Sequence, residues 1–102
     1  MRRDIFQGIA DPTRREIILL LSKDDLTINK IAENFNISRP AVSKHVKILE
    51  QCGLLQINQQ GRERYCKVNP EPLKEVYRWL KHFDKFWDEK LDALKTFVED
   101  KK

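Results

Sequence analysis

Apolar residues recur along the first half of the chain at intervals of three or four, the period of an amphipathic helix. This spacing predicts a short helix over 2–9. Asp11 and Pro12 form an N-cap followed by a proline in the first turn, so a second helix begins there and runs to about Ser22. Its apolar run over 17–21 covers nearly the whole helix circumference, which predicts the buried centre of a small core.

Two further short helices follow, separated by a tight turn. Thr27 is suited to cap a third helix, whose apolar positions keep the helical spacing as far as Phe35. Ser38 is suited to cap a fourth, which stops at Gly53 because glycine readily adopts the left-handed conformation that ends a helix. Two short helices joined so closely predict a helix-turn-helix over 27–51.

The pattern then changes. Apolar residues on either side of the polar, glycine-containing stretch NQQGRER predict a two-stranded hairpin over 54–68. Pro70 and Pro72 close the hairpin and open one long final helix over about 71–98. Its apolar stripe is wider than a small core needs, so part of it is expected to cover a partner or to pack on the first helix.

The 102 residues are enough for one domain with a modest core. The predicted fold over 1–102 is mostly α (α+β): a winged helix-turn-helix of about five helices with a two-stranded β-hairpin wing. Two cysteines are too few for a disulfide framework. Because no apolar run is long enough for a signal peptide or a membrane span, a cytoplasmic protein is expected.

The formal net charge of +4 lies entirely in the first two thirds of the chain. Residues 1–68 hold 12 Lys and Arg against 8 Asp and Glu, whereas residues 69–102 hold 8 of each. Within 38–68, six basic residues face two acidic ones. A basic excess on a helix-turn-helix and a hairpin is typical of nucleic-acid binding. A solvated surface with unevenly spread lysines is the alternative.

The fourth helix has two distinct faces. At about 100° per residue, its polar residues fall within an arc of roughly 140°, while Val42, His45, Val46 and Leu49 fill the opposite one. Arg, Lys and Ser side chains suit base edges and phosphates in a major groove, and arginines at a hairpin tip suit the adjacent backbone or minor groove. The candidate DNA-binding residues are Ser38, Arg39, Pro40, Ser43, Lys44, Lys47, Gln60, Arg62 and Arg64.

Three segments, ADPTRREIILLL, INKIAENFNISRPAVSKHVKILEQCGLL and GRERYCKVNPEPL, resemble the ArsR/SmtB family of bacterial winged-helix repressors, and the similarity extends over essentially the whole chain. The closing FWDEKLDALKTFVE is similar to a metal-independent, autorepressor-like branch. The resemblance implies a homodimer that binds a roughly palindromic operator and blocks transcription. By position, it places the candidate residues of the fourth helix on the recognition helix and those of the hairpin on the wing.

No cofactor and no metal are predicted. Metal-sensing members of the family place a cysteine pair in the third helix or sets of Asp, His and Glu in the last one. Here the third helix has no cysteine, and the last has a single histidine, His82. A transition-metal site usually needs three or four converging soft or imidazole ligands. Whether a small-molecule effector binds stays open.

Three further residues have alternative interpretations. His45 is expected to be a satisfied core histidine rather than a ligand or a pH sensor. Cys52 and Cys66 are expected to be packing residues, with a redox pair as the alternative.

The aromatic residues of the final helix would be costly to leave in water, because burying one such side chain is worth roughly 2 to 3 kcal/mol. Dimerisation through 1–10 and 71–100 is therefore expected. The expected interface residues are Ile5, Phe6, Ile9, Trp79, Phe83, Phe86, Trp87, Leu91 and Leu94.

These features favour a sequence-specific DNA-binding transcriptional regulator, a homodimeric repressor of its own or neighbouring genes whose partner is double-stranded DNA. The alternative is a winged-helix protein-interaction module, which would expose apolar anchors on the helix and hairpin. An enzyme is disfavoured, because the sequence has no nucleophile with an evident base, no Gly-rich phosphate loop and no paired carboxylates.

Overall fold

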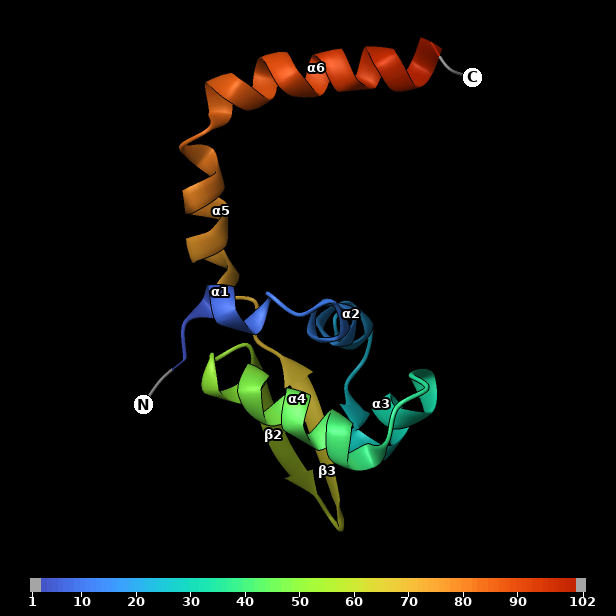
Figure 1. Cartoon of the computed structure of the whole chain (residues 1–102). Coiled ribbons are helices and arrows are strands. Elements are labelled where there is room, and N and C mark those ends of the chain that lie inside the picture. The colour runs from blue at the N-terminus through green and yellow to red at the C-terminus, as the bar shows by residue number, and fades with distance from the viewer. Residues whose placement is uncertain (1–2, 101–102) are drawn as a thin grey trace.

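The computed structural model describes residues 3–100, except for the side chains of residues 88, 89, 91, 94 and 100. Leu91 and Leu94, two of the expected interface residues, therefore lie outside the described side chains. Figure 1 shows the order of the elements. In chain order they are α1 (Ile5–Gly8), α2 (Pro12–Leu21), β1 (Leu26–Thr27), α3 (Ile28–Asn34), α4 (Arg39–Gln51), β2 (Leu55–Gln60), β3 (Glu63–Val68), α5 (Leu73–Lys81) and α6 (Asp84–Asp100).

The first two helices begin at aspartate caps. Asp4 and Gln7 form a reciprocal capping box around α1, which is only four residues long and thus shorter than predicted. At the start of α2, the Asp11 carboxylate accepts the backbone N–H of Thr13 at 2.8 Å and that of Arg14 at 3.2 Å. The predicted start and end of α2 are confirmed.

The helix-turn-helix prediction is confirmed by α3 and α4. The Thr27 hydroxyl accepts the N–H of Lys30 at 3.2 Å, and the Ser38 hydroxyl accepts that of Ala41 at 3.3 Å. Both side chains satisfy backbone donors that a helix leaves free in its first turn. At the other end of α4, Gly53 takes the left-handed conformation with φ of 78°, as expected for a helix stop.

The wing belongs to a sheet of three strands instead of two. β2 and β3 form the predicted antiparallel hairpin, and the two-residue strand β1 pairs with the other edge of β3, so the order is β1-β3-β2. Leu26 lies opposite Cys66 and Thr27 opposite Tyr65. The sequence analysis missed β1, because two residues are too few to show an alternating pattern.

One core lies between the helices and the inner face of the sheet. Its fully buried side chains are Ile17, Leu21, Ile31, Val42, Val46, Leu49, Leu54 and Cys66. The prediction that the whole run over 17–21 is buried is wrong, because Leu19 is 58% exposed and Leu20 is half-buried. α2 therefore keeps one apolar strip in contact with solvent.

The C-terminal segment is two helices, and the prediction of one long helix is wrong. No proline or glycine in the sequence marks the break at residues 82–83. The acidic side chain of Asp84 lies in the first turn of α6. Figure 1 shows α5 leading away from the core and α6 turning sharply from it. The radius of gyration is 17.0 Å, against about 13 Å for a compact chain of 100 residues.

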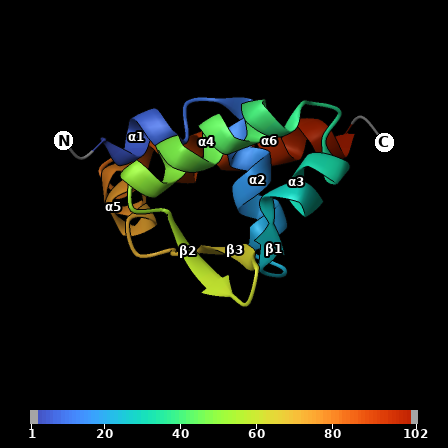
Figure 2. The ribbon, with the colours of Figure 1, turned by 90° about the horizontal axis from the view of Figure 1, so that it is seen from below.

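The wing and α6 lie at opposite ends of the molecule (Figure 1). Figure 2, seen from below, shows α1 and α5 together at one end, with the strands to one side of α4. None of the described helices is long and apolar enough to cross a membrane.

Candidate nucleic-acid interface

The fourth helix is anchored by one face and exposed on the other. Val42, Val46 and Leu49 are at most 2% exposed, and α4 packs against α2, α3 and β2. On the opposite face, Lys44 and Lys47 are exposed, as are the candidate residues of the first turn, Ser38, Arg39 and Pro40. Ser43 is half-buried, so its hydroxyl is less accessible than the helical period alone suggests.

His45 is half-buried at the edge of the core rather than within it. Its Nδ1 lies 3.5 Å from Nη1 of Arg14, which approaches from α2. The sequence predicted that the polar ring of His45 would find a partner within the fold, and Arg14 of the neighbouring helix α2 is that partner.

The wing ends in a tight turn whose outer residues are all exposed. Gln60 lies opposite Glu63, with Gly61 and Arg62 forming the two-residue connection. Gly61 has φ of 63°, a conformation that hairpin turns of this length favour and that glycine adopts without strain. Gln60, Arg62 and Arg64 are exposed around this tip, where they are free to meet a ligand.

The basic residues of α4 and the wing are not neutralised by the protein itself. The ion pairs between described residues join Lys30 to Glu33 and Lys74 to Glu71, both elsewhere in the molecule. Six basic side chains of α4 and the wing therefore have no ion-pair partner among the described residues and are available to an external anion. They are Arg39, Lys44, Lys47, Arg62, Arg64 and Lys67.

A small cleft joins the start of α4 to the wing. It has a volume of about 190 Å³ and is lined by Thr27, Ile28, Asn29, Arg39, Arg62, Glu63 and Arg64. At its wall the Nε of Arg39 donates to the Oδ1 of Asn29 at 2.5 Å. The fold thus brings one predicted residue of α4 together with two of the wing. Asn29 was not predicted, because nothing local marks an asparagine ten residues before its partner.

Tyr65 lies next to the acidic residue of this cleft. Its hydroxyl donates to a carboxylate oxygen of Glu63 at 2.9 Å. The hydrogen bond and the negative charge of Glu63 together raise the pKa of Tyr65, which is therefore a neutral donor at physiological pH.

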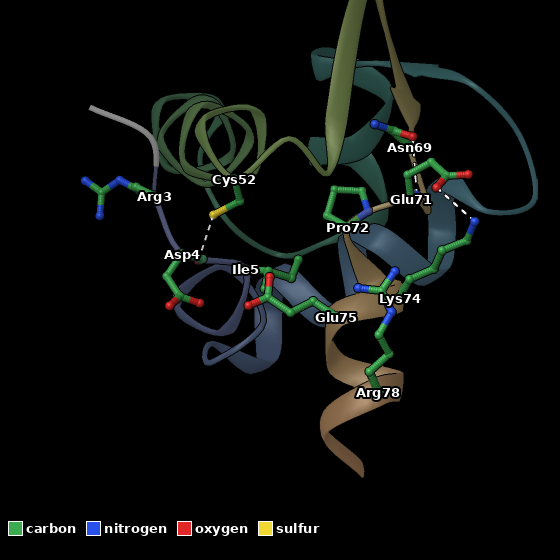
Figure 3. Close-up of a pocket in the computed structure, with 10 residues that line it drawn as sticks. All are labelled: Arg3, Asp4, Ile5, Cys52, Asn69, Glu71, Pro72, Lys74, Glu75 and Arg78. Carbon is green, nitrogen blue, oxygen red and sulfur yellow. Dashed lines mark hydrogen bonds and ion pairs between the residues drawn. The ribbon is translucent and has the colours of Figure 1, made fainter. Parts of the chain in front are cut away.

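A second, larger cleft lies between α1, the end of α4 and α5 (Figure 3). Its volume is about 690 Å³, and its lining includes three basic side chains (Arg3, Lys74 and Arg78) and three acidic ones (Asp4, Glu71 and Glu75). These charges balance, in contrast to the positive surface of α4 and the wing. The cleft therefore lacks the electrostatic character of a DNA-binding surface.

Both cysteines are free and buried. The thiol of Cys52 donates to the backbone oxygen of Asp4 at 3.3 Å (Figure 3), while Cys66 faces the core from β3. Burial raises the pKa of each thiol, so both are protonated at neutral pH. Within the described part of the chain, no three His, Cys, Asp or Glu side chains are grouped to hold a metal ion.

A capped helix-turn-helix with a basic exposed face, followed by a basic hairpin, defines a winged helix-turn-helix DNA-binding domain. Residues 11–56 match the family of bacterial regulatory proteins described as the arsR family. The transcriptional repressor SdpR of Bacillus subtilis is 39% identical over 78% of this chain and 89% of its own length. The transcriptional regulator Rv2034 of Mycobacterium tuberculosis is 31% identical over 92% of this chain and 85% of its own.

Comparison with solved structures leads to the same family. An ArsR-like transcriptional regulator from Rhodococcus superposes with a TM-score of 0.74 at 31% identity, covering 94% of this chain and 88% of its own. A possible transcriptional regulator for arsenical resistance superposes with a TM-score of 0.72 at 36% identity, covering 96% of both chains. The chain belongs to the ArsR family and is a DNA-binding transcriptional regulator.

Proposed function

We propose that the protein is a homodimeric repressor that binds a palindromic operator in its own or a neighbouring promoter. Each α4 would enter a major groove, with the wing along the adjacent backbone. The observation that carries the proposal is the surface formed by α4 and the wing, whose six basic side chains have no ion-pair partner among the described residues. The name of the relative SdpR, a transcriptional repressor, supports the direction of regulation. Binding to chromosomal DNA would make the cytoplasm its place of action.

The residues proposed to contact DNA have two different tasks. Lys44, Lys47 and the partly covered Ser43 project from the middle of α4 and would read base edges. Ser38, Arg39 and Pro40 at the start of α4 would approach the backbone, as would Gln60, Arg62 and Arg64 on the wing. The surface exposes charged rather than apolar side chains, which disfavours a protein-interaction module.

The C-terminal helices supply the proposed dimer interface. Trp79, Phe83, Phe86 and Trp87 are each between 36% and 52% exposed and line one apolar depression of about 330 Å³. An exposed apolar surface of this kind marks an interaction site. A 17-residue helix that leads away from the core also gains little stability alone, so α6 needs a partner surface.

The N-terminal segment extends this aromatic surface. The Phe6 ring meets the Trp79 ring edge-to-face with centroids 5.7 Å apart, and Trp79 meets Phe83 in the same way at 5.3 Å. Ile9 is half-buried and packs against the core, whereas Ile5 is only 4% exposed and would support the interface from within the protomer. The proposed dimerisation segments are 1–10 and 71–100.

A dimer with twofold symmetry would place two α4 helices on half-sites about one helical turn apart or a multiple of it. The experiment compares operator binding by Lys44→Ala and Lys47→Ala, with Lys74→Ala as a control that removes an equal charge from the start of α5, in the charge-balanced cleft between α1, the end of α4 and α5. Each change in α4 is expected to weaken binding about tenfold and to leave the dimer intact. Unchanged binding by both variants would contradict the assignment of the reading face.

A further inference from the structure

We infer that Arg39 binds a backbone phosphate of the operator jointly with the wing arginines, and that Asn29 of α3 is the residue that positions it. The ligand is a DNA phosphodiester, seated in the small cleft between α3, α4 and the wing. The inference rests on the proposed function and makes it more specific, because it gives the backbone contact of Arg39 a defined seat, shared with the wing arginines. It also assigns a role to Asn29, which has no place in the recognition helix or the wing.

The orientation of Arg39 is set from outside its own helix. Arg39 is the first residue of α4, and its Nε donates to the Oδ1 of Asn29 in the first turn of α3 at 2.5 Å. This bond holds the guanidinium plane toward the cleft. Within residues 3–100, the two terminal amino groups of Arg39 have no hydrogen bond or ion pair. Those groups can therefore donate to an external anion.

The wing brings two more guanidinium groups to the same place. Arg64 lies opposite Gln59 in the ladder, two positions from the pair formed by Cys66 and Ile57. Successive side chains of a strand alternate between faces, so Arg64 shares the face of the buried Cys66, which is turned toward the helices. Arg62 follows the turn glycine and lines the same cleft.

The charge of the cleft fits a phosphate. Its lining holds Arg39, Arg62 and Arg64 against a single acidic residue, Glu63, a formal excess of three minus one, or +2. The Glu63 carboxylate already accepts the hydroxyl of Tyr65. The planar guanidinium group can donate two parallel hydrogen bonds to two oxygens of a phosphate, and such charge-assisted bonds are stronger than neutral ones.

This arrangement has a consequence for specificity. Phosphate contacts fix the register of a protein on the duplex but carry no sequence information directly. Arg39 should therefore contribute to affinity and salt dependence, whereas Lys44 and Lys47 should contribute to base choice. Because the contact spans the start of α4 and the wing tip, it also fixes their relative placement on DNA.

The test uses the full-length protein and a panel of short duplexes: the selected operator, its single-base variants and an unrelated sequence. Salt titrations are compared for wild type, Arg39→Ala, Asn29→Ala and the double variant. Arg39→Ala is expected to weaken every duplex by the same factor and to reduce the salt slope by about one. Asn29→Ala is expected to weaken binding about two- to tenfold in the wild-type background and to have no effect when Arg39 is already alanine.

Two controls separate positioning from a loss of structure. Asn34→Ala changes the same residue type in the same helix, where the side chain is exposed and donates to the Lys30 oxygen, and it is expected to bind normally. Asn29→Asp keeps an acceptor for Arg39 but adds a negative charge to the cleft, so it is expected to bind more weakly than Asn29→Ala at low salt. The thermal midpoint of each variant is measured in parallel.

The inference is overturned if Arg39→Ala changes the preferred base while the salt slope stays the same. It is also overturned if Asn29→Ala weakens the Arg39→Ala protein as much as it weakens wild type. A wild-type protein with no sequence preference would contradict the proposed function instead. The phosphate contact could still be measured in that case, because it predicts the same salt slopes on the unrelated duplex.

Discussion

The guanidinium of Arg14 joins α4 to the N-terminal helix α1. Its Nη1 lies 3.5 Å from Nδ1 of His45 in α4, while its Nε donates to the Gly8 oxygen at 2.9 Å and its Nη2 to the Gln7 oxygen at 3.0 Å. The contact with His45 needs an unprotonated Nδ1, because the guanidinium has no acceptor. One side chain on α2 thus links α4, the helix proposed to read DNA, to the segment proposed for dimerisation.

Arg14→Ala should lower stability and loosen this link. The loss of bonds from one charged group to two backbone oxygens and a histidine predicts a decrease of about 1 to 3 kcal/mol in the free energy of unfolding. Chemical denaturation measures it directly. Arg15→Ala is the matched control, since Arg15 makes one such bond, to the Ile9 oxygen at 2.7 Å. Equal losses for the two variants would contradict the linking role of Arg14.

Gly8→Ala should be destabilising because of the close approach of Cys52. A Cβ at Gly8 would lie 2.8 Å from the Cys52 sulfur and 3.3 Å from a methyl carbon of Leu54. Such overpacking costs about 1 to 3 kcal/mol. Cys52→Ala removes the sulfur that the new Cβ would meet. It should therefore lower the free energy of unfolding less in the Gly8→Ala protein than in wild type. Additive losses in a double-mutant cycle would argue against the contact.

Stability should decrease in acid through the cap of α2. Burial raises the pKa of Asp11, but the backbone N–H groups of Arg14 and Thr13, together with the electrostatic effects of His45 and Arg14, outweigh it, and the net pKa is lowered from 3.8. Because the pKa of Asp11 is lower in the folded state than in the unfolded state, its stabilising effect is complete above the unfolded-state pKa. The effect is lost as the pH falls through the folded-state pKa. Asp11→Asn keeps a neutral cap, so the wild-type advantage should shrink below about pH 4. A difference that does not change with pH would contradict this.

Phe86→Gln should weaken the dimer without unfolding the protomer. Phe86 is 52% exposed in the single chain, so its loss removes little of the protomer's own packing. An aromatic side chain at the centre of an interface typically contributes 1 kcal/mol or more, and we expect dimer dissociation at about tenfold higher concentration. Sedimentation equilibrium measures this. Leu19→Gln, at an apolar position of α2 that is 58% exposed, should leave the dimer unchanged. Equal effects of Phe86→Gln and Leu19→Gln on dimer dissociation would contradict a dimer interface formed by the aromatic surface.

Local signals predicted most of the elements. The caps of Asp11, Thr27 and Ser38 and the stop at Gly53 act within a few residues, so they can be read directly from the sequence. The short strand β1 exists only because β3 lies beside it, about forty residues later in the chain. The break between α5 and α6 likewise has no proline or glycine signal, and tertiary features of this kind leave no local pattern.

The same distinction applies to the proposed DNA-binding surface. The helical period placed Lys44 and Lys47 on the exposed face of α4, and the structure agrees. It could not show that packing half-covers Ser43 or that Arg39 bonds to Asn29, because both depend on neighbouring elements. Periodicity predicts which face is free, whereas the partner of each side chain follows only from the fold.

The most direct test of the DNA-binding function is selection of bound fragments from the organism's own genomic DNA, followed by footprinting and a salt titration of the enriched sequence. We expect a short palindrome upstream of this gene or a neighbouring one, protected over two half-sites, with affinity that falls steeply as salt rises. Binding without enrichment of any sequence would contradict a specific repressor and favour a protein-interaction module.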